Sequence, residues 1–342
     1  MGSMRRNLTI IFVVILISIS GYYLFHPEKL YLKIDQLNKV LRLFDKNLKK
    51  DASSVTSRDM DIDIKKMPKY LYSITCRHQW PQAVAVFSDK LYISYKNLSS
   101  IDIYDYHGKY TDSFSPFPGG ESDPVWLATD TIGDLYVVDV KNRVVLVFDQ
   151  NHHLRYPFPP RRLNQNSEDF LHVPIAVGIY QRLVYITDMG SNSIKAFLNN
   201  GDYLMSIKGF DKNGEKPWHP IGVTLCEDGR ILVSDVMENK VAVFSCAGKF
   251  AYFFEDGDTE GKYKLSAPGA MAIDGFNRVH VVDSSSCQIF VYDNYGRFLF
   301  TYGGKGYEAS RLNSPWGITI DKTKKLVFIT DTKNQQIDVW SY

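Results

Sequence analysis

Three features are scarce or missing in this 342-residue chain, and each absence excludes a class of protein. The chain has four cysteines, at Cys76, Cys226, Cys246 and Cys287. None belongs to a CxxC pair, so their spacing predicts neither a zinc site nor a dense disulfide framework. The net charge is only +2, from 40 basic and 38 acidic residues, which argues against nucleic acid as the main ligand. A nucleophile elbow, a phosphate-binding glycine loop and an HExxH motif are also absent, so no catalytic residue is predicted.

The N-terminal region contains one uncharged apolar run, Leu8 to Phe25, which directly follows a short basic tail of residues 1–7. At about 18 residues the run is just long enough to span a bilayer as a helix. A cleaved signal peptide is the alternative, but the bulky residues 22–25 do not resemble a small-residue cleavage site. We therefore predict an uncleaved signal-anchor of a single-pass membrane protein. The bulk of the chain is expected on the extracytoplasmic side, periplasmic or extracellular, although the basic segment 29–50 opposes that orientation.

Residues 28–50 are predicted to form an amphipathic helical stalk. Their apolar residues recur at alternating steps of four and three, at Leu30, Ile34, Leu37, Leu41, Phe44 and Leu48. This period is typical of a coiled-coil seam, so residues 30–48 could join copies of the chain into a homo-oligomer. Alternatively, the helix packs on the following domain or lies among lipid headgroups, with its basic residues facing anionic lipid. Residues 51–64 lack an apolar period and are expected to form a linker.

From Pro81 onward, one pattern of four strands recurs six times. Each unit has a proline, an apolar strand, a second strand that usually ends in aspartate, a third strand that ends near an aromatic residue, and an outer strand. Successive repeat prolines are 43, 50, 46, 48 and 47 residues apart, at Pro81, Pro124, Pro174, Pro220, Pro268 and Pro315. This spacing is near the length of a four-stranded propeller blade. The sequence therefore predicts an all-β, six-bladed β-propeller over residues 65–342.

The sixth unit ends at Tyr342, directly after its third strand, so its outer strand must come from elsewhere. Residues 70–75, with the sequence YLYSIT, closely match the outer strand of the third unit, YLMSIK at 203–208. We expect the 70–75 strand to pair with the strand at 337–340 and so close the ring, which would remove two free sheet edges.

The recurring order of proline, small residue, apolar strand, Val-x-Asp, asparagine, apolar-x-Val-Phe and glycine resembles the NHL repeat, in a membrane-anchored, bacterial-type member of that family. The resemblance implies a six-bladed propeller. It does not choose a function, because relatives include protein-binding modules, RNA-binding domains and an amidating lyase with metal-bound histidines. The chain departs from the lyase pattern. Only His172 and His219 lie close before repeat prolines, two residues before Pro174 and one before Pro220, and His78 precedes Pro81 by three residues.

Five units end their second strand in an aspartate, at Asp139, Asp188, Asp235, Asp283 and Asp331. A ring of carboxylates suggests metal binding or acid–base chemistry. The simpler interpretation is that each aspartate binds the backbone amides of nearby turns. In the first unit Tyr95 takes this place, which leaves that position open to a ligand.

The loops between units are expected to open on the same face as the turns after the second strands. Candidate ligand-binding residues on that face are Tyr95, Trp126, Arg161, Arg162, His172, Trp218, His219 and Trp316. Exposed aromatic and arginine residues on ordered loops are typical of binding hot spots, and ordinary loop packing is the alternative. Trp126 occupies a position where the other units have alanine or glycine, so it is predicted to project into the channel, as a plug or as a stacking surface.

These features together predict a membrane-anchored propeller scaffold that binds a protein, peptide or glycan partner through its loop face, with no cofactor. The alternative is a metal-dependent lyase or hydrolase of the cell envelope, with a divalent metal at the channel mouth. His172 and His219 would then supply two of the three or four ligands that zinc requires.

Overall fold

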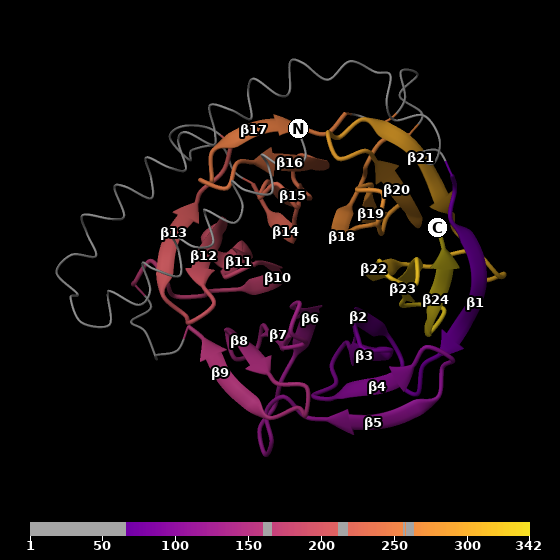
Figure 1. Cartoon of the computed structure of the whole chain (residues 1–342), viewed down its shortest axis with the longest axis horizontal. Coiled ribbons are helices and arrows are strands. Elements are labelled where there is room, and N and C mark those ends of the chain that lie inside the picture. The colour runs from indigo at the N-terminus through magenta and orange to yellow at the C-terminus, as the bar shows by residue number, and fades with distance from the viewer. Residues whose placement is uncertain (1–65, 160–165, 211–217, 256, 258–262) are drawn as a thin grey trace, which may run out of the picture. The chain divides into compact units, whose positions relative to one another are not determined.

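Six four-stranded antiparallel sheets surround one axis in the computed structural model, each sheet forming one blade of a propeller (Figure 1). The structure describes residues 66–159, 166–210, 218–255, 257 and 263–342. The predicted anchor (8–25), stalk (28–50) and linker (51–64) lie outside these residues, as do Arg161 and Arg162. Within the described ranges, no helical segment has the length and apolar character needed to cross a membrane.

The blades follow the chain in order, each beginning at a repeat proline on the inner strand. Blade 1 contains β2 (Pro81–Phe87), β3 (Lys90–Tyr95), β4 (Ile101–Asp105) and β5 (Tyr110–Phe114). Blade 2 contains β6 (Pro124–Thr129), β7 (Leu135–Asp139), β8 (Val144–Phe148) and β9 (Leu154–Phe158). Blade 3 contains β10 (Pro174–Tyr180), β11 (Leu183–Asp188), β12 (Ser193–Leu198) and β13 (Tyr203–Ile207), with the short 3₁₀ turn η2 (Met189–Ser191) between β11 and β12.

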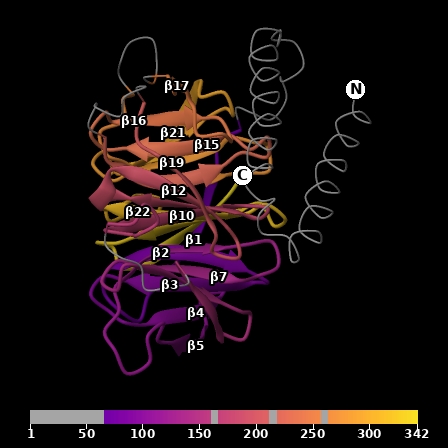
Figure 2. The ribbon, with the colours of Figure 1, turned by 90° about the vertical axis from the view of Figure 1, so that its left-hand side faces the viewer.

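The other three blades repeat this arrangement. Blade 4 contains β14 (Pro220–Leu225), β15 (Ile231–Asp235), β16 (Lys240–Phe244) and β17 (Phe250–Phe253). Blade 5 contains β18 (Pro268–Ile273), β19 (Val279–Asp283), β20 (Gln288–Tyr292) and β21 (Phe298–Gly303). Blade 6 contains β22 (Pro315–Asp321), β23 (Leu326–Asp331), β24 (Gln336–Ser341) and the N-terminal strand β1 (Lys69–Thr75). Figure 2 shows the same ring from its edge.

The burial of each strand depends on its place in the blade. The second and third strands are buried along almost their whole length, because each blade is covered on both sides by its neighbours; β7, for example, is buried at all five positions. Such strands have continuous rather than alternating apolar sequences. The outer strands face solvent and are more polar, as the exposed centre of β5 shows. The core therefore lies between the blades.

The inner strands crowd at the axis and are linked from blade to blade by hydroxyl groups. A Cβ atom added at Gly222 would lie 2.4 Å from the carbonyl oxygen of Gly269 in the next blade, so only glycine fits there. Ser234 Oγ accepts a hydrogen bond from Gly222 N (2.8 Å) and donates to Gly269 O (2.8 Å). Thr187 in blade 3 and Thr330 in blade 6 form the same links to their neighbours. These links hold the channel walls at a fixed spacing.

The ring closes as the sequence predicted. Strand β1 pairs antiparallel with β24, with Tyr70 opposite Trp340 and Ile74 opposite Ile337. Ser73 Oγ donates a 2.5 Å hydrogen bond to Asp338 Oδ1 across this seam. Because β1 and β24 come from opposite ends of the propeller sequence, their pairing joins the first and last parts of the ring. It also leaves β24 without an unpaired edge.

Candidate functional site

One face of the ring, called here the proline face, contains the beginnings of all six inner strands and the loops between blades. In every blade the repeat proline lies opposite the last residue of the second strand, which places both on this face. The inner-strand hairpins and the turns before the outer strands lie at the other face, called here the hairpin face. The described candidate residues lie in strands and loops at the proline-face end of the blades, although the side chains of Tyr95 and Trp218 are buried there.

The five second-strand aspartates each bind the loop that enters their own blade. In blade 3 the buried Asp188 carboxylate accepts hydrogen bonds from His172 N (3.1 Å), Val173 N (2.7 Å) and Ser191 Oγ (2.6 Å). Equivalent bonds to loop or turn amides are formed by Asp139, Asp235, Asp283 and Asp331. The simpler interpretation of the aspartates is confirmed: they fix the loops of the proline face.

Blade 1 has no such aspartate, and its entry loop is held differently. Tyr95 is fully buried, and its hydroxyl donates to Asp102 Oδ2 at 3.1 Å. Arg77 N in the loop donates to Tyr104 OH (2.9 Å), and the His78 ring packs edge-on against Tyr95 with 5.2 Å between ring centroids. Burial raises the pKa of Asp102. The side chain of Tyr95 thus belongs to the core of blade 1 and is not exposed on the proline face.

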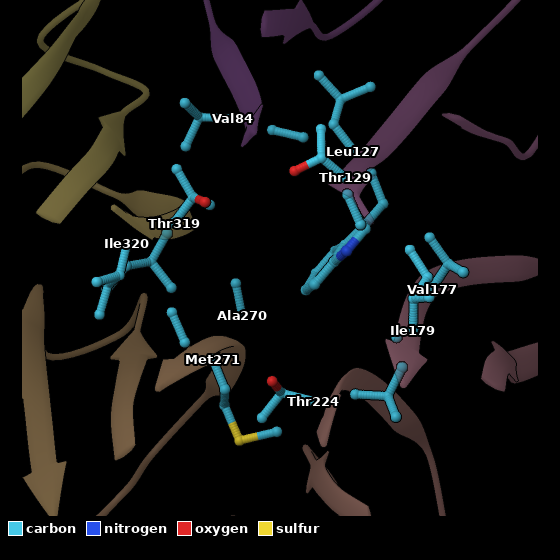
Figure 3. A pocket seen from close by; sticks show the side chains of 18 of the residues that line it. Val84, Leu127, Thr129, Val177, Ile179, Thr224, Ala270, Met271, Thr319 and Ile320 are labelled. Atoms are coloured by element: carbon cyan, nitrogen blue, oxygen red, sulfur yellow. The ribbon is translucent and has the colours of Figure 1, made fainter. Parts of the chain in front are cut away.

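The central channel contains a cavity of about 320 Å³ that the six inner strands surround. Figure 3 shows the apolar and threonine side chains around it. Every inner strand contributes to this lining, for example with Val84, Leu127, Val177, Thr224, Ala270 and Thr319. Trp126 lines this cavity and is only 8% exposed, so the prediction that it projects into the channel is confirmed. The other lining residues lie at its level or nearer the hairpin face. Trp126 therefore stands at the proline-face end of the cavity, which favours its interpretation as a plug.

The remaining candidate residues are placed in different environments. Trp218 is 1% exposed; its Nε1 donates to Asn192 O at 2.5 Å and its ring packs against Phe210, so it belongs to the core. His219 is partly exposed. His172 is exposed over 41% of its side chain, with Nδ1 3.6 Å from Asp188 Oδ2. Across the described residues, no three His, Cys, Asp or Glu side chains gather in a way that could hold a metal ion.

Three exposed aromatic residues lie on the proline face of blades 6 and 1, and together they are called here the aromatic patch. Trp80 is 45% exposed, Tyr307 82% and Trp316 38%. Blades 6 and 1 adjoin at this level, because Thr332 Oγ1 donates to Pro81 O (2.8 Å). Of these three residues, the sequence pattern indicated Trp316 but neither Trp80 nor Tyr307. A usable signal was present for Trp80, which directly precedes a repeat proline as His219 does.

A second cavity, of about 370 Å³, lies beside blade 3 and is called here the polar hollow. Charged and hydroxyl side chains line it, among them Glu168, His172, Ser193, Lys195, Ser206 and Lys208. Of the candidate residues that the structure describes, only His172 lines this cavity. The lysines were missed because no local motif marks them; strand pairing brings Lys195 and Ser206 side by side.

The closed ring of six four-stranded sheets defines the class of protein as a six-bladed β-propeller. No protein-family model matches the chain, and no curated protein matches it in sequence. Solved propellers are similar in structure. Virginiamycin B lyase from Staphylococcus aureus matches with a TM-score of 0.56 and 12% identity, over 79% of this chain and 98% of the lyase.

Two further solved structures resemble the ring to the same degree. A streptogramin B lyase matches with a TM-score of 0.58 and 14% identity, over 82% of this chain and 99% of the lyase. A gluconolactonase from Xanthomonas campestris matches with a TM-score of 0.59 and 13% identity, over 82% of this chain and 96% of the enzyme. At such low identity the likeness shows the shared fold alone.

Proposed function

We propose that this chain is a membrane-anchored propeller that binds a protein partner through its proline face. The observation that supports this most directly is the aromatic patch, where Trp80, Tyr307 and Trp316 expose large aromatic rings on the proline face of two adjoining blades. Tryptophan and tyrosine are the residue types that dominate binding hot spots. They also lose little conformational entropy on binding, because each has only two side-chain torsions.

The choice of a protein rather than a glycan rests on the other exposed apolar residues of the same face. Met189 is 36% exposed and directly follows β11, and Met237 is 52% exposed and lies two residues after β15, so both are in turns of the proline face. Methionine is enriched with aromatic residues in protein–protein interfaces. The ordered loops also favour binding, because a surface that is already ordered loses less conformational entropy when it binds.

The predicted anchor and the repeat pattern indicate where the partner is located and support a binding role. The apolar run Leu8 to Phe25 would hold the propeller at a membrane with the ring on the extracytoplasmic side, so the partner is a protein of the envelope or cell surface. The resemblance of the repeats to the NHL repeat is consistent with this role, because protein-binding modules occur among its relatives. The lyase and lactonase activities of the solved neighbours are not carried over, since the likeness extends only to the fold.

Site-specific photo-crosslinking of the full-length chain in its native membrane tests this proposal. A photoreactive phenylalanine would replace Trp80 in one variant, Trp316 in a second and Ile132 in a control. Ile132 is 62% exposed but lies in an inner-strand hairpin of blade 2, on the hairpin face. We expect the same protein to crosslink from positions 80 and 316 and not from 132.

The captured protein must then bind the purified full-length chain. Trp80→Ala combined with Trp316→Ala should weaken that binding at least about tenfold, as expected for hot-spot residues. Equal affinity of the double variant and the unsubstituted chain would overturn the proposal, and so would crosslinking that does not depend on position.

A further inference from the structure

The polar hollow contains two lysines that form no direct ion pair with a carboxylate among the described residues, although Asp188, Asp169 and Glu168 act on Lys195 from a greater distance. Lys195 is only 4% exposed, and its Nζ donates a 2.5 Å hydrogen bond to the backbone carbonyl of Glu168. Lys208, on the outer edge of the same blade, is exposed and lines the same cavity. The carboxylate of Glu168 lies 3.5 Å from Tyr203 OH and forms no ion pair with either lysine.

A buried ammonium group without an ionic partner is costly, because its hydration is lost and only partly replaced. Burial accordingly lowers the pKa of Lys195. The fold does not require a lysine at this position. In the matching register of the third strand, blades 2, 4 and 5 have Leu146, Ala242 and Phe290, each opposite the central residue of its second strand. Blades 1 and 6 have Asp102 and Asp338 in this register, so blade 3 is the one blade with a positive charge there, and this buried charge needs a compensating interaction.

Hydroxyl groups surround the two lysines and can supply further hydrogen bonds. Ser206 lies opposite Lys195 in the strand pairing, and its Oγ is 2.8 Å from Tyr203 OH. Ser193 precedes Lys195 by two residues, so both side chains point to the same side of the sheet. The Ser193 hydroxyl is already used, because it lies 2.7 Å from Ser191 Oγ and donates to it, while Ser191 donates to Asp188. The His172 ring forms another part of the wall, and its Nδ1 has no hydrogen-bond partner. Below it, the Asp188 carboxylate is already occupied by backbone amides and Ser191.

We propose that the polar hollow binds the oxyanion group of a small ligand, a phosphate or a carboxylate, between Lys195 and Lys208 with a hydroxyl donor from Ser206. Two ammonium groups offset the charge of such a group, and charge-assisted hydrogen bonds are the strongest that these side chains can form. The volume of about 370 Å³ falls within the range of small-molecule sites, so the ligand extends beyond a single ion. This site is independent of protein binding, because the aromatic patch lies on other blades.

Thermal unfolding of the full-length chain in detergent, at constant ionic strength, tests the site. The probes are inorganic phosphate, glucose 6-phosphate and glucuronate, each compared with sodium chloride. Ligands that bind only the folded state raise the unfolding midpoint. We expect at least one oxyanion probe to raise the midpoint by about 2–4 °C, with saturation at millimolar concentration. A shift with the phosphates alone assigns a phosphate ligand, and a shift with glucuronate alone assigns a carboxylate.

Three variants distinguish the hollow from general salt effects. Lys195→Met should fold, because blade 2 has leucine at this position, and should lose the oxyanion-dependent shift; Lys195→Arg, which keeps the charge, should retain at least part of it. Lys208→Met changes an exposed residue and should weaken the shift without altering the ligand-free midpoint. Lys249→Met, an exposed lysine before the outer strand of blade 4, is the matched control and should keep the whole shift. The proposal fails if no probe stabilises the unsubstituted chain, or if both Lys195→Met and Lys208→Met keep the full effect.

Discussion

Blades 3 and 6 place opposite charges at the same position of their third strands, and the two charges have different surroundings. Lys195 in blade 3 and Asp338 in blade 6 each lie opposite the central isoleucine of the neighbouring second strand. Asp338 is fully buried inside the closing seam, where Ser73 and Gln336 donate hydrogen bonds to it. Lys195 instead borders a cavity with one backbone acceptor. An enclosed charge can be neutralised by a proton, whereas a charge beside a cavity can be neutralised by a ligand.

The largest expected effect comes from removing the seam that encloses Asp338. A chain that begins at residue 76 lacks β1, so β24 loses its partner and the buried Asp338 loses Ser73. We expect this truncation to lower the free energy of unfolding by on the order of 5 kcal/mol or more, which is enough to abolish cooperative folding. The control chain begins at residue 65 and keeps β1. Circular dichroism melts of the two chains check the prediction, and two equal melting curves would show that β1 is dispensable.

A slightly smaller effect is expected from placing a lysine at the equivalent position of blade 2, which lies in the packed core. Leu146 occupies the equivalent position in blade 2 and is 2% exposed within a core cluster. Leu146→Lys would bury an ammonium group without a partner, so we expect a loss of about 3–5 kcal/mol. Urea unfolding measures this loss, with Leu146→Met as the control for volume. A loss below about 1 kcal/mol would mean that this register tolerates charge in any blade, and the contrast with Lys195 would disappear.

The stability of the folded state is expected to depend on pH through Asp338. Burial raises the pKa of Asp338 to about 6, whereas an unfolded aspartate titrates near 3.9. The folded state therefore holds this proton more tightly, so the contribution of Asp338 to stability is fully present below about pH 4 and is lost as the pH rises through about 6. Asp338→Asn should remove roughly 2–3 kcal/mol of this fall. At pH 8 the variant should be more stable than the unsubstituted chain, and near pH 4 the two should be alike.

Asp331 strengthens the same pH trend, because burial raises its pKa to about 7 and the neighbouring Asp338 charge adds to the effect. Urea unfolding curves recorded from pH 4 to pH 8 measure both contributions. Part of the slope should remain in Asp338→Asn because Asp331 is still present. An unchanged slope in that variant would show that Asp338 is ionised throughout the range.

The smallest effect on stability is expected at Trp316. Two tryptophans, Trp218 and Trp316, allow a buried position to be compared with an exposed one. Trp218 is buried and hydrogen-bonded, so Trp218→Ala should cost about 3–5 kcal/mol. Trp316 is 38% exposed on the proline face, so Trp316→Ala should change stability by no more than about 0.5 kcal/mol. Thermal unfolding compares the two. A large loss at Trp316 would place it in the core and weaken its assignment to a binding surface.

The candidate site could be predicted only in part from the sequence. Trp126 was found because one residue broke the pattern of small side chains at a repeated position, and its place in the channel agrees. Trp218 was expected at the surface but is buried, because Phe210 of the same interblade loop packs against it, a contact that local sequence does not encode. Of the polar hollow the sequence indicated only His172; Lys195 and Lys208 were missed, because strand pairing and the interblade loop bring them to one cavity and no local motif marks them.

The sequence by itself determined the fold. Prolines at regular spacing, β-branched strands and turn residues specify each blade locally, and the unmatched strand at 70–75 determined how the ring closes, because a free edge strand must find a partner. Only the tertiary structure decided which side chains are enclosed and which are open. That distinction depends on how one blade covers the next, so residues of the same type, such as Trp218 and Trp316, acquire opposite roles at positions that look alike in the sequence.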